Sequence, residues 1–205
     1  FSLGNDFSGG DGAATMFSQN PDNKYVVYNY VYNNAVSVLN MNNPSNDRSY
    51  WWRISSNDNN EGDFINKGAL DSNLGIIYMS ADAGKVRAYH NWDDFAPGSQ
   101  GTTKDSYLIE NLGSRVTSMN VSPFQTQSST LYVGNEVGQL WKVTNAQNPN
   151  NQTKEQINGD EFYGSISDIE FGVDENHIFI TFYNYGVESI FYTSDGGETW
   201  DKKEG

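Results

Sequence analysis

The residues whose types and spacing could do chemistry lie between Thr193 and Trp200. Asp195 supplies a carboxylate, Gly197 follows it, and Thr199 and Trp200 add a hydroxyl and an indole. A carboxylate in such a turn can accept hydrogen bonds from backbone N–H groups and from the threonine hydroxyl, and glycine allows a positive φ. We therefore predict a structural turn that closes a hairpin and buries Trp200, and favour this role over Asp195 as a catalytic carboxylate.

Clusters of aromatic residues could stack against sugar rings, and three of them stand out: Tyr50-Trp51-Trp52, Tyr89 to Trp92, and Tyr183 to Tyr185. Because successive side chains of a strand point to opposite faces, one of two adjacent tryptophans belongs in the core. Core packing is thus the alternative to glycan binding at each cluster. The candidate ligand-binding residues are Asp11, Trp92, Tyr183 and Tyr185.

Metal and thiol chemistry have few candidate residues. The sequence has no cysteine and two histidines, so disulfides, thiolate zinc sites and cysteine nucleophiles are excluded. The loop from Asn57 to Asp63 has the oxygen density of a calcium site, but it lacks the ordered ligand positions of an EF-hand. We expect no catalytic residue, no metal and no cofactor, with calcium at this loop as the alternative.

The charge of the chain excludes further functions. Its 26 acidic and 12 basic side chains give a net charge of −14, which repels phosphate backbones and argues against nucleic-acid binding. No apolar run approaches the length needed to cross a bilayer, so we expect no membrane insertion. Aromatic residues make up 14% of the 205 positions, which favours a folded chain over a disordered one.

The elements that must position these residues are short strands, because β-branched and aromatic residues form short runs between Gly, Asn, Asp and Ser. Tight turns between the runs predict antiparallel meanders. The expected strands are Thr15 to Ser18, Tyr25 to Tyr30, Ala35 to Leu39, Tyr50 to Ile54, Gly75 to Ser80, Val86 to His90, Tyr107 to Glu110, Val116 to Val121, Thr130 to Val133, Gln139 to Val143, a short strand near Ile157, Ile166 to Phe171, His177 to Tyr183 and Ser189 to Thr193.

The strands recur in sets with a period of about fifty residues. The second strands of the sets begin near Tyr25, Gly75, Thr130 and His177. This period is typical of four-stranded propeller blades rather than of helical repeats. We predict an all-β fold, a β-propeller fragment of about four antiparallel four-stranded blades, at residues 9–60, 61–112, 113–160 and 161–205, within a longer chain.

The chain resembles a family at this point. Residues 193–200 fit the Asp-box, (S/T)-x-D-x-G-x-(T/S)-W, so the chain is similar to Asp-box (BNR-type) β-propellers, which include sialidase-like and sortilin-like propellers and xyloglucan-type endoglucanases. A closer resemblance is to propeller regions of surface proteins that Bacteroidota export by the type IX secretion system. It is carried by Gly9-Gly10-Asp11-Gly12-Ala13, Tyr28 to Asn34, Gly62 to Asn66, Leu131 to Gly134, Ile166 to Gly172 and Asn184 to Val187.

The resemblance implies a location outside the cell or on the outer surface of a Gram-negative bacterium. We expect a non-catalytic propeller that acts as an interaction or display scaffold, either an adhesin or a substrate-recognition module. The end blades of a partial ring expose apolar faces, so the expected partner is the remaining blades or another protein chain, with a glycan as a further candidate. The alternative is a fragment of a secreted glycoside hydrolase, which needs two carboxylates facing each other, such as Asp11 and Asp168.

Overall fold

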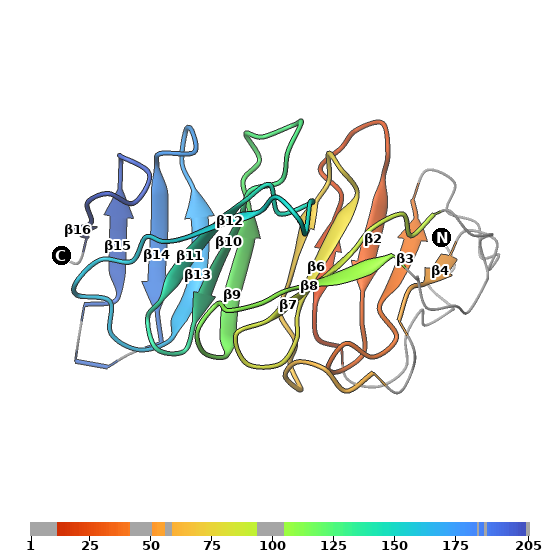
Figure 1. Cartoon of the computed structure of the whole chain (residues 1–205), viewed down its shortest axis with the longest axis horizontal. Coiled ribbons are helices and arrows are strands. Elements are labelled where there is room, and N and C mark those ends of the chain that lie inside the picture. The colour runs from red at the N-terminus through yellow and green to blue at the C-terminus, as the bar shows by residue number, and fades with distance from the viewer. Residues whose placement is uncertain are drawn as a thin grey trace, which may run out of the picture. The chain divides into compact units, whose positions relative to one another are not determined.

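The computed structural model describes residues 12–41, 51–55, 59–93, 105–183, 185–186 and 188–203, and their regular elements are all β-strands (Figure 1). The strands form four antiparallel four-stranded sheets. The predicted all-β class is therefore confirmed. Within the described ranges, no helix is long and apolar enough to cross a membrane.

Each sheet is a meander in which every strand pairs with its neighbour in the sequence. The first sheet contains β1 (Thr15–Phe17), β2 (Tyr25–Tyr28), β3 (Ser37–Asn40) and β4 (Trp51–Arg53). The second contains β5 (Gly68–Asp71), β6 (Ile76–Ser80), β7 (Val86–Tyr89) and β8 (Ser106–Ile109).

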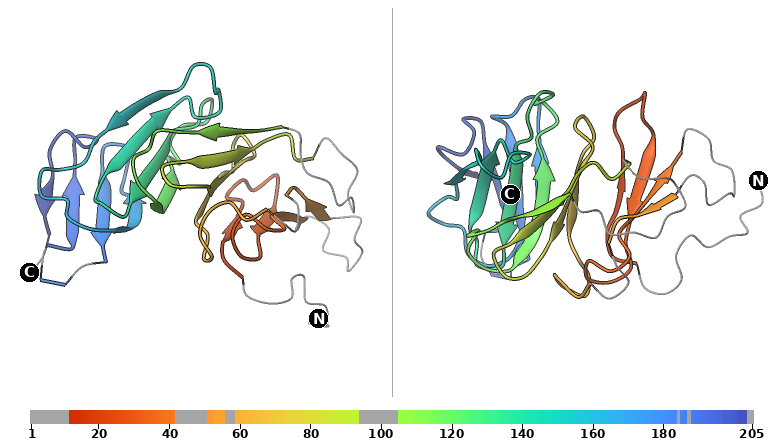
Figure 2. Two further views of the ribbon diagram at one scale, coloured as in Figure 1. Left: turned by 60° about the horizontal axis from the view of Figure 1, so that its bottom comes forward. Right: turned by 45° about the vertical axis from the view of Figure 1, so that its right-hand side comes forward.

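The third and fourth sheets repeat this order. The third contains β9 (Val116–Val121), β10 (Leu131–Asn135), β11 (Leu140–Thr144) and β12 (Thr153–Gln156). The fourth contains β13 (Ile166–Phe171), β14 (Ile178–Phe182), β15 (Ile190–Thr193) and β16 (Asp201–Lys202). Figure 2 shows β13, β14 and β15 side by side from two further directions.

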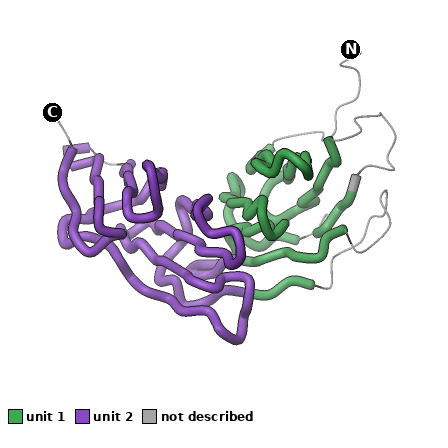
Figure 3. The backbone as a smooth tube through the Cα atoms, turned by 90° about the horizontal axis from the view of Figure 1, so that it is seen from above, with its two compact units in different colours: residues 1–81, 87–107 green, residues 82–86, 108–205 purple. Residues whose placement is uncertain are grey.

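The chain divides into two compact units (Figure 3). The first contains the described residues up to Ala81 and those from Arg87 to Tyr107, and the second contains residues 82–86 and those from 108 onward. The core of the first unit lies between its sheets and includes Val27, Val38, Trp52, Ile77, Met79 and Trp92. The core of the second unit includes Tyr132, Leu140, Phe162, Ile169, Ile180 and Phe191.

Two strands, β5 and β16, were not predicted from the sequence, because their composition is not typical of strands. The sequence did not predict β5, which begins at Gly68, where a Cβ atom would lie 2.9 Å from Met16 Cε and from Met79 Sδ. The close packing of Met16 and Met79 therefore requires glycine at position 68. Glycine is disfavoured in strands, so the sequence did not indicate a strand here. The polar strand β12 precedes Ile157, and the two-residue strand β16 was also not predicted. These edge strands form by pairing with a neighbour and carry little apolar signal of their own.

Candidate functional site

One end of each sheet gathers the loops that could form a binding site. In a meander, the segment entering the first strand and the loop between the second and third strands lie at the same end, because adjacent strands run in opposite directions. We call this the loop end. In the first unit it includes residues 29–36 and the described part of the segment between β4 and β5. In the second unit it includes residues 157–165 and the described part of residues 183–189.

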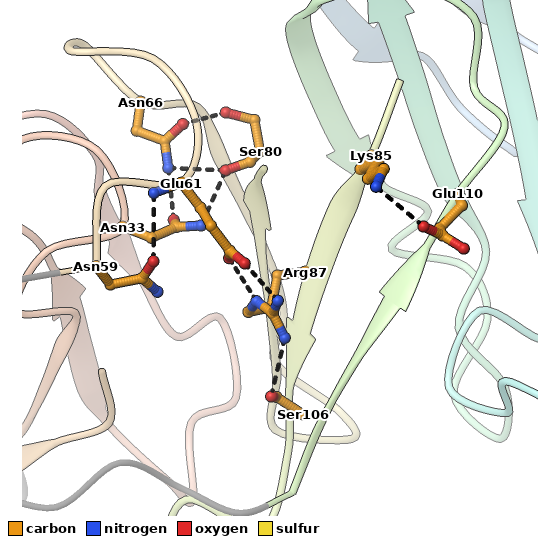
Figure 4. Close-up of polar contacts among 9 residues, drawn as sticks. All are labelled: Asn33, Asn59, Glu61, Asn66, Ser80, Lys85, Arg87, Ser106 and Glu110. Carbon is orange, nitrogen blue, oxygen red and sulfur yellow. Dashed lines mark hydrogen bonds and ion pairs between the residues drawn. The ribbon is translucent and has the colours of Figure 1, made fainter. Parts of the chain in front are cut away.

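The loop end of the first unit is held by an ion pair between Glu61 and Arg87 (Figure 4). Arg87 Nε and Nη2 donate to Glu61 Oε2 and Oε1 at 2.6 and 2.5 Å, and Nη1 donates to Ser106 Oγ at 3.2 Å. Such a two-pronged contact fixes the orientation of both side chains. Hydrogen bonding from Arg87 lowers the pKa of the Glu61 carboxyl group below its usual value.

Buried amide side chains continue this network (Figure 4). Asn66 Nδ2 donates to Asn33 Oδ1 at 2.6 Å, and both side chains donate to the carbonyl oxygen of Ser80 at 3.0 Å. The backbone N–H of Asn33 donates to the carbonyl of Glu61 at 2.9 Å. Asn33 and Asn66 are almost fully buried, so their hydrogen bonds tie the two loops and β6 together.

The hydrogen bonds of Glu61 and Asn59 involve the loop from Asn57 to Asp63, which the sequence suggested as a calcium site. Both carboxylate oxygens of Glu61 bind Arg87, and Asn59 Oδ1 accepts the backbone N–H of Glu61 at 3.2 Å. Asn57 and Asp58 lie outside the described residues. The described part of this loop therefore forms internal hydrogen bonds and an ion pair.

In the second unit, buried Asn135 donates to the carbonyl of Leu112 at 3.2 Å and Arg115 pairs with Glu136 at 3.0 Å, and glycine backbones make further close contacts. A Cβ atom on Gly138, in the turn between β10 and β11, would lie 2.5 Å from the carbonyl oxygen of Phe162. A Cβ atom on Gly84 would lie 2.4 Å from the carbonyl oxygen of Gly113. Both glycines have positive φ, so the turn conformation and the close approach each favour glycine. In this unit each turn packs directly on the segment that enters the next sheet.

Three exposed tyrosines occupy the loop end of the fourth sheet. Tyr163, Tyr183 and Tyr185 have exposed fractions of 62%, 68% and 104%. The backbone N–H of Tyr183 donates to the carbonyl of Ser165 at 2.9 Å, which joins the loop after β14 to the segment before β13. We call Tyr163, Tyr183 and Tyr185 the tyrosine surface.

Lys202 joins the same two loops through ion pairs. Its ammonium group contacts Glu161, in the segment before β13, and lies 3.9 Å from Glu188, in the loop before β15. Hydrogen bonding to Glu161 raises the pKa of Lys202 above its usual value. Lys202 and Glu161 also line an open cavity of about 320 Å³ together with Asn158, Gly159, Asp160, Phe191, Glu198, Thr199 and Trp200.

The turn from Thr193 to Trp200 lies between β15 and β16. Asp195 Oδ1 accepts from the backbone N–H of Thr199 at 2.9 Å and from the Thr193 hydroxyl at 2.6 Å, and Oδ2 accepts from the Thr199 hydroxyl at 2.5 Å. These bonds lower the pKa of Asp195 well below its usual value. Gly197 has a φ of 101°, and the indole of half-buried Trp200 donates to the carbonyl of Ile157 at 2.8 Å.

The candidate ligand-binding residues that the structure describes differ from one another in their exposure to solvent. Trp92 is 5% exposed, packs against Tyr25 and Trp52, and donates to the carbonyl of Gly75 at 2.8 Å. It is a core residue, so the core-packing alternative holds at this cluster and Trp92 is withdrawn as a candidate ligand-binding residue. Tyr183 and Tyr185 are both exposed in the segment after β14, whereas Asp11 lies outside the described residues.

Sequence reasoning missed Tyr163. The repeat carried no signal for its exposure. Gly164-Ser165 lies 51 positions after Gly113-Ser114, and both pairs precede the first strand of a sheet. In this alignment Tyr163 corresponds to Leu112, which is fully buried. The fourth sheet therefore differs from the third at this position, because Tyr163 is exposed where Leu112 is buried.

Comparison with known proteins places the fold. No family model matches the chain, and no curated protein matches it significantly. Among solved structures, a GH74 enzyme of Niastella koreensis superposes with a TM-score of 0.58 and 16% identity, covering 95% of this chain and 30% of that one. PorZ, a surface component of the type-IX secretion system of Porphyromonas gingivalis, gives 0.56 and 15%, covering 92% and 26%.

These similarities concern the fold. Both neighbours contain propellers, and the described residues form four antiparallel four-stranded sheets, so the predicted propeller class is confirmed. The chain spans less than a third of the length of either neighbour.

Proposed function

We propose that this chain is a non-catalytic part of a propeller on a bacterial cell surface, where it acts as an interaction scaffold, either an adhesin or a substrate-recognition module. The observation that carries the proposal is the tyrosine surface, three large side chains that remain exposed at one loop end. Exposed aromatic residues grouped on a folded domain are typical of binding surfaces. The likeness to PorZ, a surface component of type-IX secretion, supports the location and a Bacteroidota origin.

The turn around Asp195 supports a structural role in this proposal. Its carboxylate accepts three hydrogen bonds within seven residues, and this arrangement suits an Asp-box that fixes the link between β15 and β16. Thr193, Asp195, Gly197, Thr199 and Trp200 would then be structural residues of the blade.

The outer face of the fourth sheet suggests a partner. Phe179 and Ile190 are 41% and 39% exposed, whereas the residues at the same positions of the third sheet, Tyr132 and Leu140, are fully buried in the core with the fourth sheet. We propose that the outer face packs against further blades of the same polypeptide or against another protein chain.

A second candidate function is part of a secreted glycoside hydrolase, favoured by the likeness to the GH74 enzyme. Incubating the purified chain with a panel of plant and bacterial polysaccharides, and measuring the release of reducing ends, separates the two. The scaffold proposal predicts binding without release. Release that is lost when one Asp or Glu is changed to Asn or Gln would overturn it.

A further inference from the structure

We propose that the tyrosine surface binds an extended, arginine-rich segment of a partner protein. This inference rests on the proposed scaffold function and specifies the chemistry of the partner. It is carried by two observations at the loop end of the fourth sheet: the exposure of Tyr163, Tyr183 and Tyr185, and the charge of the two loops that present them.

The described parts of the two loops are joined at two points. The Tyr183 N–H donates to the Ser165 carbonyl, and Lys202 lies between Glu161 and Glu188. Each loop therefore contributes both exposed rings and carboxylates. A backbone bond and a shared cation hold the two loops to each other before any partner arrives, which reduces the ordering needed on binding.

The charge of this surface is negative. Residues 157–165 and 183–189 contain three acids, Asp160, Glu161 and Glu188, and no basic residue, and Lys202 is the ammonium group that meets two of them. The whole chain carries a net charge of −14, so its field attracts cations over longer distances.

Arginine fits this combination of groups. A guanidinium can lie over the face of a tyrosine ring, and its planar donors match a carboxylate in a two-pronged contact. An extended segment lets successive arginines reach rings and carboxylates on both loops. A neutral glycan could use the ring faces but would gain nothing from the charge, so the observations favour the cationic segment.

The test measures the affinity of the 205-residue chain for a fluorescein-labelled nonapeptide of alternating glycine and arginine, by fluorescence anisotropy. The double variant Tyr183→Ser with Tyr185→Ser keeps the net charge and removes two exposed rings. We expect its affinity to fall about tenfold, as for the loss of two exposed cation–π contacts. The matched control is Phe17→Ser, which removes a 61% exposed ring from the first unit and leaves the affinity unchanged.

Two further arms test the charge. The double variant Glu161→Gln with Glu188→Gln should bind several-fold more weakly and show a smaller dependence on salt. A peptide with citrulline in place of arginine keeps the side-chain length without the charge, and it should bind at least tenfold more weakly than the arginine peptide.

Three results would overturn the inference. The first is equal affinity of the Tyr183/Tyr185 double variant and the Phe17 variant, which would leave only general attraction to a negative protein. The second is equal binding of the citrulline peptide. The third is binding of cellohexaose that requires Tyr183 and Tyr185 while peptide binding does not. Release of reducing ends from a polysaccharide would instead overturn the proposed scaffold function. A failure of the peptide-binding inference is therefore distinguishable from a failure of the proposed function.

Discussion

The two units use the same strand order, but the loops of their two sheets meet through different chemistry. In the first unit, buried amides and the Glu61–Arg87 pair connect the loops. In the second, Gly138 lets a turn touch the carbonyl of Phe162 directly, and aromatic rings fill the space beneath. A meander therefore does not prescribe how its loops are fixed. Polar contacts also occur in the second unit, where buried Asn135 donates to the carbonyl of Leu112 and Arg115 pairs with Glu136, but these contacts lie within the third sheet and the segment that enters it.

The two units also expose different side chains at their loop ends. At the loop end of the first unit, Asn33 and Asn66 are buried, whereas Phe64 and Ile65 are 51% and 62% exposed. At the loop end of the fourth sheet, a backbone hydrogen bond and the ion pairs of Lys202 hold the loops, and Tyr163, Tyr183 and Tyr185 are exposed.

The largest expected effect tests the aromatic side of the comparison. Phe162 is 6% exposed, and its ring lies 4.8, 5.0 and 5.1 Å from the rings of Phe191, Trp200 and Phe182. Phe162→Ala should lower the free energy of unfolding by about 4 kcal/mol, because it leaves a cavity in the core. Urea unfolding measures the loss. Phe124→Ala, at a 41% exposed ring of the same unit, is the control and should cost clearly less. Equal losses would show that the rings around Phe162 do not act as a core.

The next effect tests the glycine contact. Gly138→Ala should cost about 3 kcal/mol, because the new methyl group meets a carbonyl oxygen and the residue keeps a positive φ. Gly186 has a φ of 76° with open space around it, so Gly186→Ala isolates the cost of φ at about 1 kcal/mol. Thermal and urea unfolding of both variants measure the difference. If the two substitutions cost the same, the close approach at Gly138 is not needed.

The polar side of the comparison is tested by an intermediate effect. Glu61→Gln should lower the free energy of unfolding by about 2 kcal/mol at pH 7, because Arg87 loses its charged acceptor in a half-buried setting. Glu110, which pairs with Lys85 at 3.2 Å at a more exposed position of the second unit, is the matched control (Figure 4). Glu110→Gln should cost about 0.5 kcal/mol or less.

The same pair predicts a pH dependence. The pKa of folded Glu61 lies below the usual value of 4.5, so its contribution is complete above that value and is lost as the pH falls through the folded pKa. Urea unfolding of the wild type and of Glu61→Gln should therefore converge in acid. A constant difference between pH 7 and pH 3 would contradict the ion pair.

The smallest effect concerns the turn around Asp195. Asp195→Asn should lower the thermal midpoint at pH 7 by less than Glu61→Gln does, because the turn is exposed to solvent. The folded pKa of Asp195 is lowered, so the difference from the wild type is present above 3.8 and disappears in stronger acid. Calorimetry at pH 7 and in acid measures it. Glu198→Gln, in the same turn, is the control, and an equal shift for both variants would remove the special role of Asp195.

Some parts of this molecule were predictable because their signal is local. Side chains that alternate between apolar and polar predicted strands such as Ile166–Phe171, and the tight turns between strands predicted the meander. Gly68 carries no such pattern, because its type is set by Met16 and Met79 packed against it. At the candidate site, the sequence indicated Tyr183, Tyr185 and Trp92 equally as aromatic candidates for ligand binding. In the structure the two tyrosines are exposed and Trp92 is buried.

The sequence by itself determined the all-β class, the period of about fifty residues and the donors and acceptors of the turn from Thr193 to Trp200. These features depend on residues a few positions apart, and backbone geometry relates such residues directly. Only the tertiary structure decided that Glu61 meets Arg87, that Trp92 lies in the core, and that Tyr163 is exposed where Leu112 is buried. Those outcomes depend on which distant segments cover a side chain, and burial is a property of the packed chain.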